Sequence, residues 1–127
     1  MEQYSAVELI KHGGITIPIF ESQIVVANGN SNDNPINVLP FSRGMFFLRC
    51  TQIAGGGSEE LDVWIETKDP AGEYWFTLTS FWPVLTEIGG RIKTPFLIPI
   101  LGEKISIAWD LTDITSVTFS VYGVFKV

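Results

Sequence analysis

The sequence is poor in two things that many functional classes need, cysteine and basic charge. Cys50 is the single cysteine in 127 residues, so no disulfide can form within the chain and no thiolate cluster can hold a metal. Eight Lys and Arg stand against 14 Asp and Glu, which gives a net charge of -6, and the basic residues are scattered. Because no basic stripe is present, the sequence predicts no binding to nucleic acid or to anionic membrane surfaces.

Long apolar runs are absent as well. No stretch approaches the roughly 18 residues that would span a bilayer, and the chain does not start with a basic segment followed by an apolar run. We therefore expect neither a membrane span nor a signal peptide. Hydrophobic residues make up 46% of the chain and charged residues 17%, a globular composition, and the length suffices for one core.

What the sequence does contain is a series of short runs in which apolar and polar residues alternate. This period of two is typical of strands that are buried on one face. In the last stretch, residues 102–127, the side chains expected to face the core are Ile105, Ile107, Trp109, Val117, Phe119 and Val121. The polar link at residues 111–116 predicts a hairpin there, and residues 60–81 predict a second hairpin that turns at Pro70 and Gly72.

Proline and asparagine set the remaining elements apart. Pro18 places residues 15–20 at a sheet edge or strand end, and Pro95 and Pro99 make residues 91–100 an edge strand. The Asn-rich residues 28–35 are typical of an exposed loop. Residues 45–51 form an apolar run of the kind that is covered on both faces.

Together these runs give seven or eight short strands without a sustained helical period or an internal repeat. The predicted fold class is all-β, an antiparallel β-sandwich or jelly roll that forms one domain over residues 15–127. Residues 1–14, with Val7, Leu9 and Ile10, are either an extended N-terminal arm that orders on a partner or a first edge strand packed on its own domain.

No group of residues predicts catalysis, a cofactor or a metal site. His12 lies beside two glycines near the chain start, where a catalytic base would not be held rigidly. Cys50 lies in an apolar strand and is expected to be a small core residue. The carboxylates occupy strand faces and turns, and Asp33 is the only one in the Asn-rich loop, too few for calcium. We expect a protein that is not an enzyme.

Three tryptophans are the candidate binding residues. Trp64 falls on the polar face of its strand, Trp75 faces away from its two aromatic neighbours, and Trp82 precedes Pro83. Exposed tryptophans often mark protein contacts, and in carbohydrate-binding sandwiches they stack on sugars. Burial within the fold, a protein interface and a sugar platform all remain open from the sequence. Val7, Leu9 and Ile10 complete the candidate interface.

Several strand sequences together resemble a known family. They are residues 61–67 (LDVWIET) with Pro70, Gly72 and Tyr74-Trp75 after them, residues 105–109 (ISIAW), and residues 117–124 (VTFSVYGV). This order resembles small β-sandwich virion structural proteins of tailed bacteriophages, and the likeness covers residues 42–127. The Trp82-Pro83 step and the strand with Pro95 and Pro99 depart from the family pattern.

The resemblance implies a structural protein, of the capsid decoration (cement) type, that binds the major capsid protein on the outer surface of the phage head. It implies manufacture in the host cytoplasm, a place on the virion and a homo-oligomer, with a trimer preferred. The alternatives are a tail or baseplate accessory protein and a module that binds carbohydrate or a receptor. No catalytic residue is carried over from the family.

Overall fold

The computed structural model describes residues 14–69, 71–72, 74–97 and 104–127, with the side chains of residues 92–97 excepted. The predicted N-terminal arm, with Val7, Leu9, Ile10 and His12, lies outside the described residues. Seven strands make up the described part: β1 (Ile15–Val25), β2 (Gly29–Asn30), β3 (Ile36–Asn37), β4 (Arg43–Lys68), β5 (Trp75–Ser80), β6 (Gly89–Leu97) and β7 (Lys104–Lys126). This part contains no helix that is long and apolar enough to cross a membrane.

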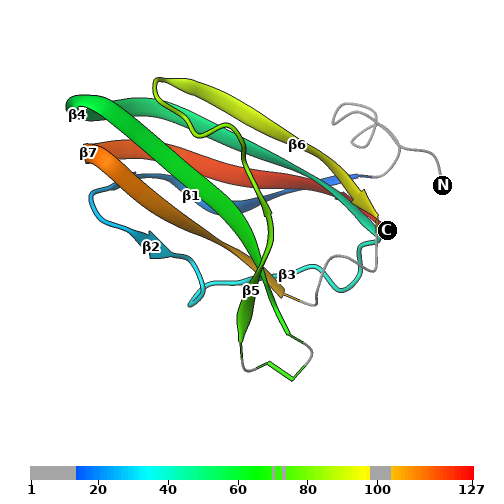
Figure 1. Ribbon diagram of the computed structural model, residues 1–127. Coiled ribbons are helices and arrows are strands. Elements are labelled where there is room, and N and C mark those ends of the chain that lie inside the picture. Colours follow the sequence, from blue (N-terminus) through cyan, green and yellow to red (C-terminus); the bar gives the residue numbers. More distant parts are fainter. Residues whose placement is uncertain (1–13, 70, 73, 98–103) are drawn as a thin grey trace.

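The fold is organised around two long strands, β4 and β7, which pair antiparallel along nearly their whole length. Residues 43–54 of β4 pair with residues 116–126 of β7, and residues 60–67 pair with residues 105–112. Both strands bend sharply between these two halves, so the ribbon folds back over itself (Figure 1). Each long strand therefore contributes to two layers.

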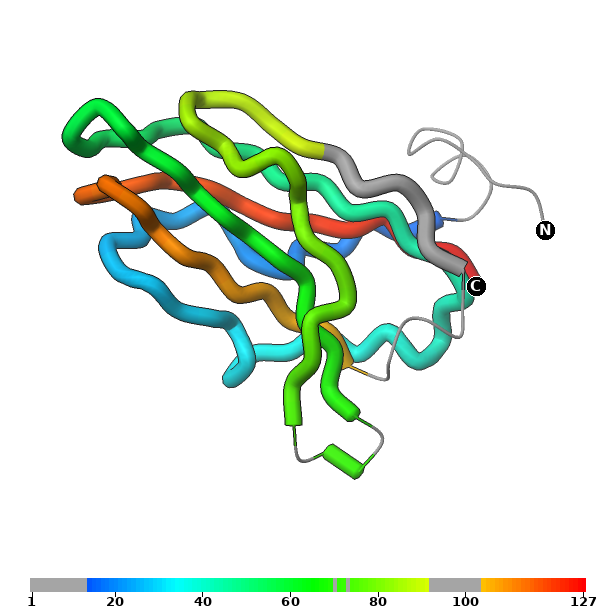
Figure 2. Tube along the Cα trace, in the orientation of Figure 1, coloured from blue at the N-terminus to red at the C-terminus, as the bar shows by residue number. Residues whose placement is uncertain are grey.

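The shorter strands extend both layers. In the first layer, β1 pairs with the second half of β7 and β6 pairs with the first half of β4. In the second layer, β2 and β3 pair with the first half of β7 and β5 pairs with the second half of β4. This order of strands is that of a jelly roll, in which two four-stranded antiparallel layers face each other. The course of the chain through the two layers can be followed in Figure 2.

The core lies between the layers. Phe46 and Phe119 come from the first layer, Val63 and Ile107 from the second, and none of these four side chains is exposed to solvent. Phe20 of β1 joins them across the gap, with its ring centroid 4.9 Å from that of Trp109. The core-facing assignments made from residues 102–127 are confirmed, because all six residues predicted to face the core are buried. Ser106 and Ala108 lie on the opposite face of β7 and were expected to face solvent, but they are buried as well.

The all-β, antiparallel prediction is confirmed, but one of its two hairpins is wrong. Residues 60–81 do form a hairpin, since β4 and β5 pair antiparallel. Residues 111–116, in contrast, do not turn a hairpin, because β7 continues through them and crosses from the second layer to the first. A hairpin and a layer crossing have the same local alternation, and only the pairing of both halves with β4 distinguishes them. The strands also differ from the short strands expected, since β4 and β7 have 26 and 23 residues.

At the bend where β7 passes from the second layer to the first, Asp113 packs closely against a run of glycines in β4. Asp113 has a positive φ of 52°, and its carboxylate accepts a hydrogen bond of 2.7 Å from the backbone amide of Ser58. A Cβ at Gly55 would overlap the backbone oxygen of Asp113, and a Cβ at Gly56 would lie 2.5 Å from its carboxylate. The glycine-rich composition of residues 53–58 is typical of a flexible connection, but these residues lie within β4 and pack against the bend of β7.

Residues 28–35 were expected to be an exposed loop, and this is wrong in part. Gly29 and Asn30 pair with β7 as strand β2. Asn28 and Ser31 accept hydrogen bonds from the backbone amides of Leu111 and Ile107 through their side-chain oxygens. The polar side chains thus take the place of backbone partners along the edge of the second layer, which is why a loop-like composition forms part of a sheet.

The two proline-containing strands lie at the edges of the first layer, as predicted. Among the described residues, β1 with Pro18 pairs with β7 on one side, and β6 with Pro95 pairs with β4 on one side. Proline has no N–H to donate, so an edge position leaves no hydrogen bond of the ladder unmade. Pro99 lies outside the described residues.

Candidate protein-interaction surface

The candidate site follows strand β5 at one edge of the second layer. In the described part of the chain, β5 pairs with β4 along one side and has no strand along the other. Tyr74 and Phe76 lie at its start, and Trp82 and Ile88 lie in the segment that leaves its far end. These four side chains are all exposed. We call Tyr74, Phe76 and Trp82 the β5-edge surface. Ile88 lies apart from them, next to Gly89, which pairs with Cys50 in the first layer.

The hairpin that joins β4 and β5 projects beyond the two layers (Figure 1). Among the described residues, Thr67 is the last residue of β4 that pairs with β7, and Lys68 pairs with Trp75 of β5 alone. The side chain of Phe76 shares a face with Thr67, so it points toward the core side but lies beyond the residues that form the core. It is 53% exposed for this reason.

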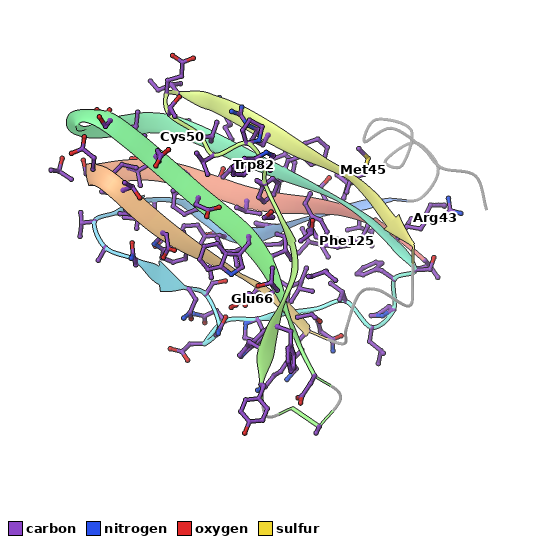
Figure 3. All side chains as sticks on the ribbon, in the orientation of Figure 1. Arg43, Met45, Cys50, Glu66, Trp82 and Phe125 are labelled. Atoms are coloured by element: carbon purple, nitrogen blue, oxygen red, sulfur yellow. The ribbon has the colours of Figure 1, made fainter. Side chains whose placement is uncertain are left out.

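Of the large apolar side chains that the structure describes, that of Trp82 is the most exposed, at 76%. It directly follows Phe81, which is buried and whose backbone amide donates a hydrogen bond to the carbonyl of Val63. Three residues further on, Leu85 is buried and forms two backbone hydrogen bonds with Leu61. Anchors on both sides thus fix the segment that carries Trp82, which lies on the chain between β5 and β6 (Figure 3).

The other two predicted tryptophans are partly covered by their own neighbours. The indole Nε1 of Trp64 donates a hydrogen bond of 3.3 Å to a carboxylate oxygen of Glu66 on the same face of β4. The ammonium of Lys68 lies 5.6 Å from the centroid of the Trp75 ring, within the range of a cation–π contact. Both rings are half-buried, so they offer less surface to a partner than Trp82 does.

Carboxylates gather on the outer face of the second layer, beside Trp64. Asp62 pairs directly with Asp110 across the β4–β7 ladder. Partial burial raises the pKa of Asp62, and the negative charges of Asp110 and Glu60 raise it further. Asp62 and Asp110 are far apart in the chain, and only the register of the ladder brings them together.

The described residues contain no group of three or more His, Cys, Asp and Glu side chains that could hold a metal ion. Cys50 is buried in the core, as expected, and burial raises the pKa of its thiol. Its sulfur lies 3.5 Å from the backbone oxygen of Gln52, a contact that acts in the opposite direction on the pKa. A thiol that is buried and protonated is a packing group.

Sequence reasoning selected Trp82 but passed over Tyr74, Phe76 and Ile88. Tyr74 and Phe76 alternate with Trp75, so their pattern assigns them to the core side of the strand. They are exposed because the hairpin extends beyond the end of the opposite layer. The local sequence pattern does not indicate where that layer ends. The structure does not bring Trp64, Trp75 and Trp82 into one cluster, since Trp64 and Trp75 lie on the outer face and Trp82 lies past the end of β5.

No protein-family model matches this sequence, and no curated protein matches it. Among solved structures, the fold is similar to a chain in the structure of infectious bursal disease virus strain Gx, with a TM-score of 0.43 and 15% sequence identity. The match covers 89% of the present chain and 32% of the viral one, so the present chain spans about a third of that chain's length. At this level the similarity concerns the all-β architecture alone.

Proposed function

We propose that this protein is a non-enzymatic structural component of a virion, a capsid decoration protein that binds the major capsid protein on the outside of a phage head. The observation that carries the proposal is the β5-edge surface. It combines exposed aromatic side chains with a strand that is unpaired along one side in the described part of the chain. The resemblance of the β4–β5 hairpin and of β7 to phage virion proteins supports the same class.

The chemistry of the β5-edge surface suits docking onto another protein. An edge strand can accept a strand of a partner through its free backbone groups, while side chains such as Phe76 and Trp82 fill apolar pockets. Each contact can be weak, because many copies bound to a symmetric shell are held collectively. We propose a homotrimer as the bound form, since three-fold sites recur on such shells.

The test is cosedimentation of the purified protein with assembled phage capsids. Replacing Phe76 and Trp82 by Ser should abolish binding and leave the fold intact, because neither side chain is part of the core. Ile24→Ser is the matched control, since Ile24 is 68% exposed but lies on β1 in the other layer. Absence of the protein from purified virions would overturn the proposal, and its presence in tails without heads would assign it to the tail or baseplate.

The carbohydrate-binding alternative depends on a different residue. Trp64 lies on the outer face of the second layer with Glu66 and Asp62 on the same strand, and carboxylates beside an aromatic ring can accept hydrogen bonds from sugar hydroxyls. Binding on a glycan array that is lost in Trp64→Ala and retained in Trp82→Ser would favour this function over capsid binding.

A further inference from the structure

The outer face of the first layer changes from polar to apolar along its length. The outward side chains of β7 are, in order, Thr118, Ser120, Tyr122 and Val124, and those opposite them on β4 include Arg49, Phe47 and Met45. Phe47 and Tyr122 stack with ring centroids 4.9 Å apart. Met45, Phe47, Tyr122 and Val124 therefore form a continuous cluster, which we call the outer apolar patch.

Burial follows the same gradient. Val124 is 1% exposed and Met45 is 8% exposed, although both point away from the core. Ile24 lies on the same outer face, beside Thr118 at the polar end of the layer, and is 68% exposed. An apolar side chain on an open sheet face is expected to resemble Ile24. Met45 and Val124 are therefore as buried as side chains that another segment covers.

The described chain begins next to this patch. Thr16 of β1 pairs with Val124, which pairs in turn with Met45, so these three residues form one row across three strands. With strands about 4.8 Å apart, Met45 lies roughly 10 Å from Thr16 along the row. Four residues, the number from 11 to 14, can span at most about 13 Å, and glycines such as Gly13 and Gly14 allow a chain to reverse sharply.

From these relationships we infer that the outer apolar patch is the docking site for the protein's own N-terminal segment, residues 6–10. This segment reads AVELI, so four of its five residues are apolar and match the patch in character. The segment is tethered beside the patch, which gives it a high effective concentration there compared with a second copy or a foreign chain. Docking would shield Met45 and Val124 from solvent in the free protein. The inference does not depend on the proposed role in a virion.

The inference is tested by labelling the thiol of a Met45→Cys variant of the full chain with a maleimide reagent. The native Cys50 is buried, and its background reaction is measured in the parent chain. We expect slow labelling of Cys at position 45, and acceleration of about tenfold or more when Leu9→Asp and Ile10→Asp are added, because two charges would expel the segment from an apolar surface. The matched control adds the same two charges at Gln3 and Ser5, where labelling should stay slow.

Each outcome of the labelling decides the matter. Slow labelling that is independent of protein concentration, and is released only by the charges at positions 9 and 10, supports docking within one molecule. Fast labelling in the otherwise native chain would mean that the patch is open. Protection that disappears on dilution would identify a second copy as the cover, and protection unaffected by Leu9→Asp and Ile10→Asp would exclude the N-terminal segment. Circular dichroism of each variant verifies that the sandwich is folded.

Discussion

Trp109 and Phe119 belong to the same strand, β7, yet they meet edge to face across the core with ring centroids 5.6 Å apart. Trp109 belongs to the second layer and Phe119 to the first, and the bend at Asp113 lies between them. A single strand thus supplies both walls of the core. The contact joins the two layers at the centre of the jelly roll, where burial contributes most to stability.

Truncation of Phe119 tests this central position. Phe119 is fully buried and also stacks on Phe20 at 5.0 Å, so Phe119→Ala should lower the free energy of unfolding by about 3–5 kcal/mol. Urea denaturation followed by tryptophan fluorescence measures the change. Thr118→Ala is the matched control on the opposite face of β7 and should cost less than about 1 kcal/mol. A loss below about 1 kcal/mol for Phe119→Ala would refute the core assignment.

Substitution of Asp113 tests the bend. Ala at this position would keep the left-handed backbone angle without the hydrogen bond to Ser58, so Asp113→Ala should cost about 1–2 kcal/mol. Asn tolerates the angle and can still accept the hydrogen bond, so Asp113→Asn should stay closer to the parent protein. Thermal unfolding followed by circular dichroism ranks the variants. Equal losses in both would show that tolerance of the left-handed angle and a neutral hydrogen-bond acceptor do not support the bend.

A double-mutant cycle measures how much the hydrogen bond of the Ser106 hydroxyl contributes to stability. Ser106 is completely buried, and its hydroxyl forms a hydrogen bond with the side-chain oxygen of Asn32 in the segment after β2. Asn32→Ala leaves the buried hydroxyl without this partner and should cost about 1–3 kcal/mol in unfolding free energy. Adding Ser106→Ala removes the orphaned group, so the double variant should be no less stable than Asn32→Ala alone. Strictly additive losses would contradict the pairing.

The raised pKa of Asp62 predicts a pH dependence of stability. Because the folded state favours the protonated carboxyl, the stability contributed by Asp62 is full below the ordinary carboxyl pKa of about 3.9 and is lost as pH rises through the higher folded pKa. Asp62→Asn carries no charge at any pH, so it should be more stable than the parent near neutral pH. This advantage should vanish at about pH 3, where the carboxyl is neutral in both states.

Unfolding free energies measured across this pH range verify the effect, with Asp33→Asn as the control. Asp33 is exposed and lies in the segment between β2 and β3, away from the ladder that joins Asp62 and Asp110. A stability difference for Asp62→Asn that stays constant with pH would show that the effect comes from packing and not from ionisation.

The candidate site was predictable in part. Trp82 was one of three tryptophans selected as candidate binding residues, and it is highly exposed in the structure. Its role in binding stays a prediction, as do those of Trp64 and Trp75. Phe76 was assigned to the core side by its alternation, and its exposure depends on the length of the opposite layer, which is a property of the assembled fold. Val7, Leu9 and Ile10 remain predictions that the labelling experiment addresses.

The sequence by itself determined the all-β class and the two faces of the main strands. Alternation is a local property, since successive side chains of a strand must point to opposite sides, and this placed Ile107 and Phe119 in the core. Tertiary structure alone decided the partners. Residues 111–116 cross between layers because β4 offers both halves of β7 a longer ladder than a hairpin would, and that choice depends on contacts between residues far apart in the chain. Trp109 and Phe119 meet for this reason.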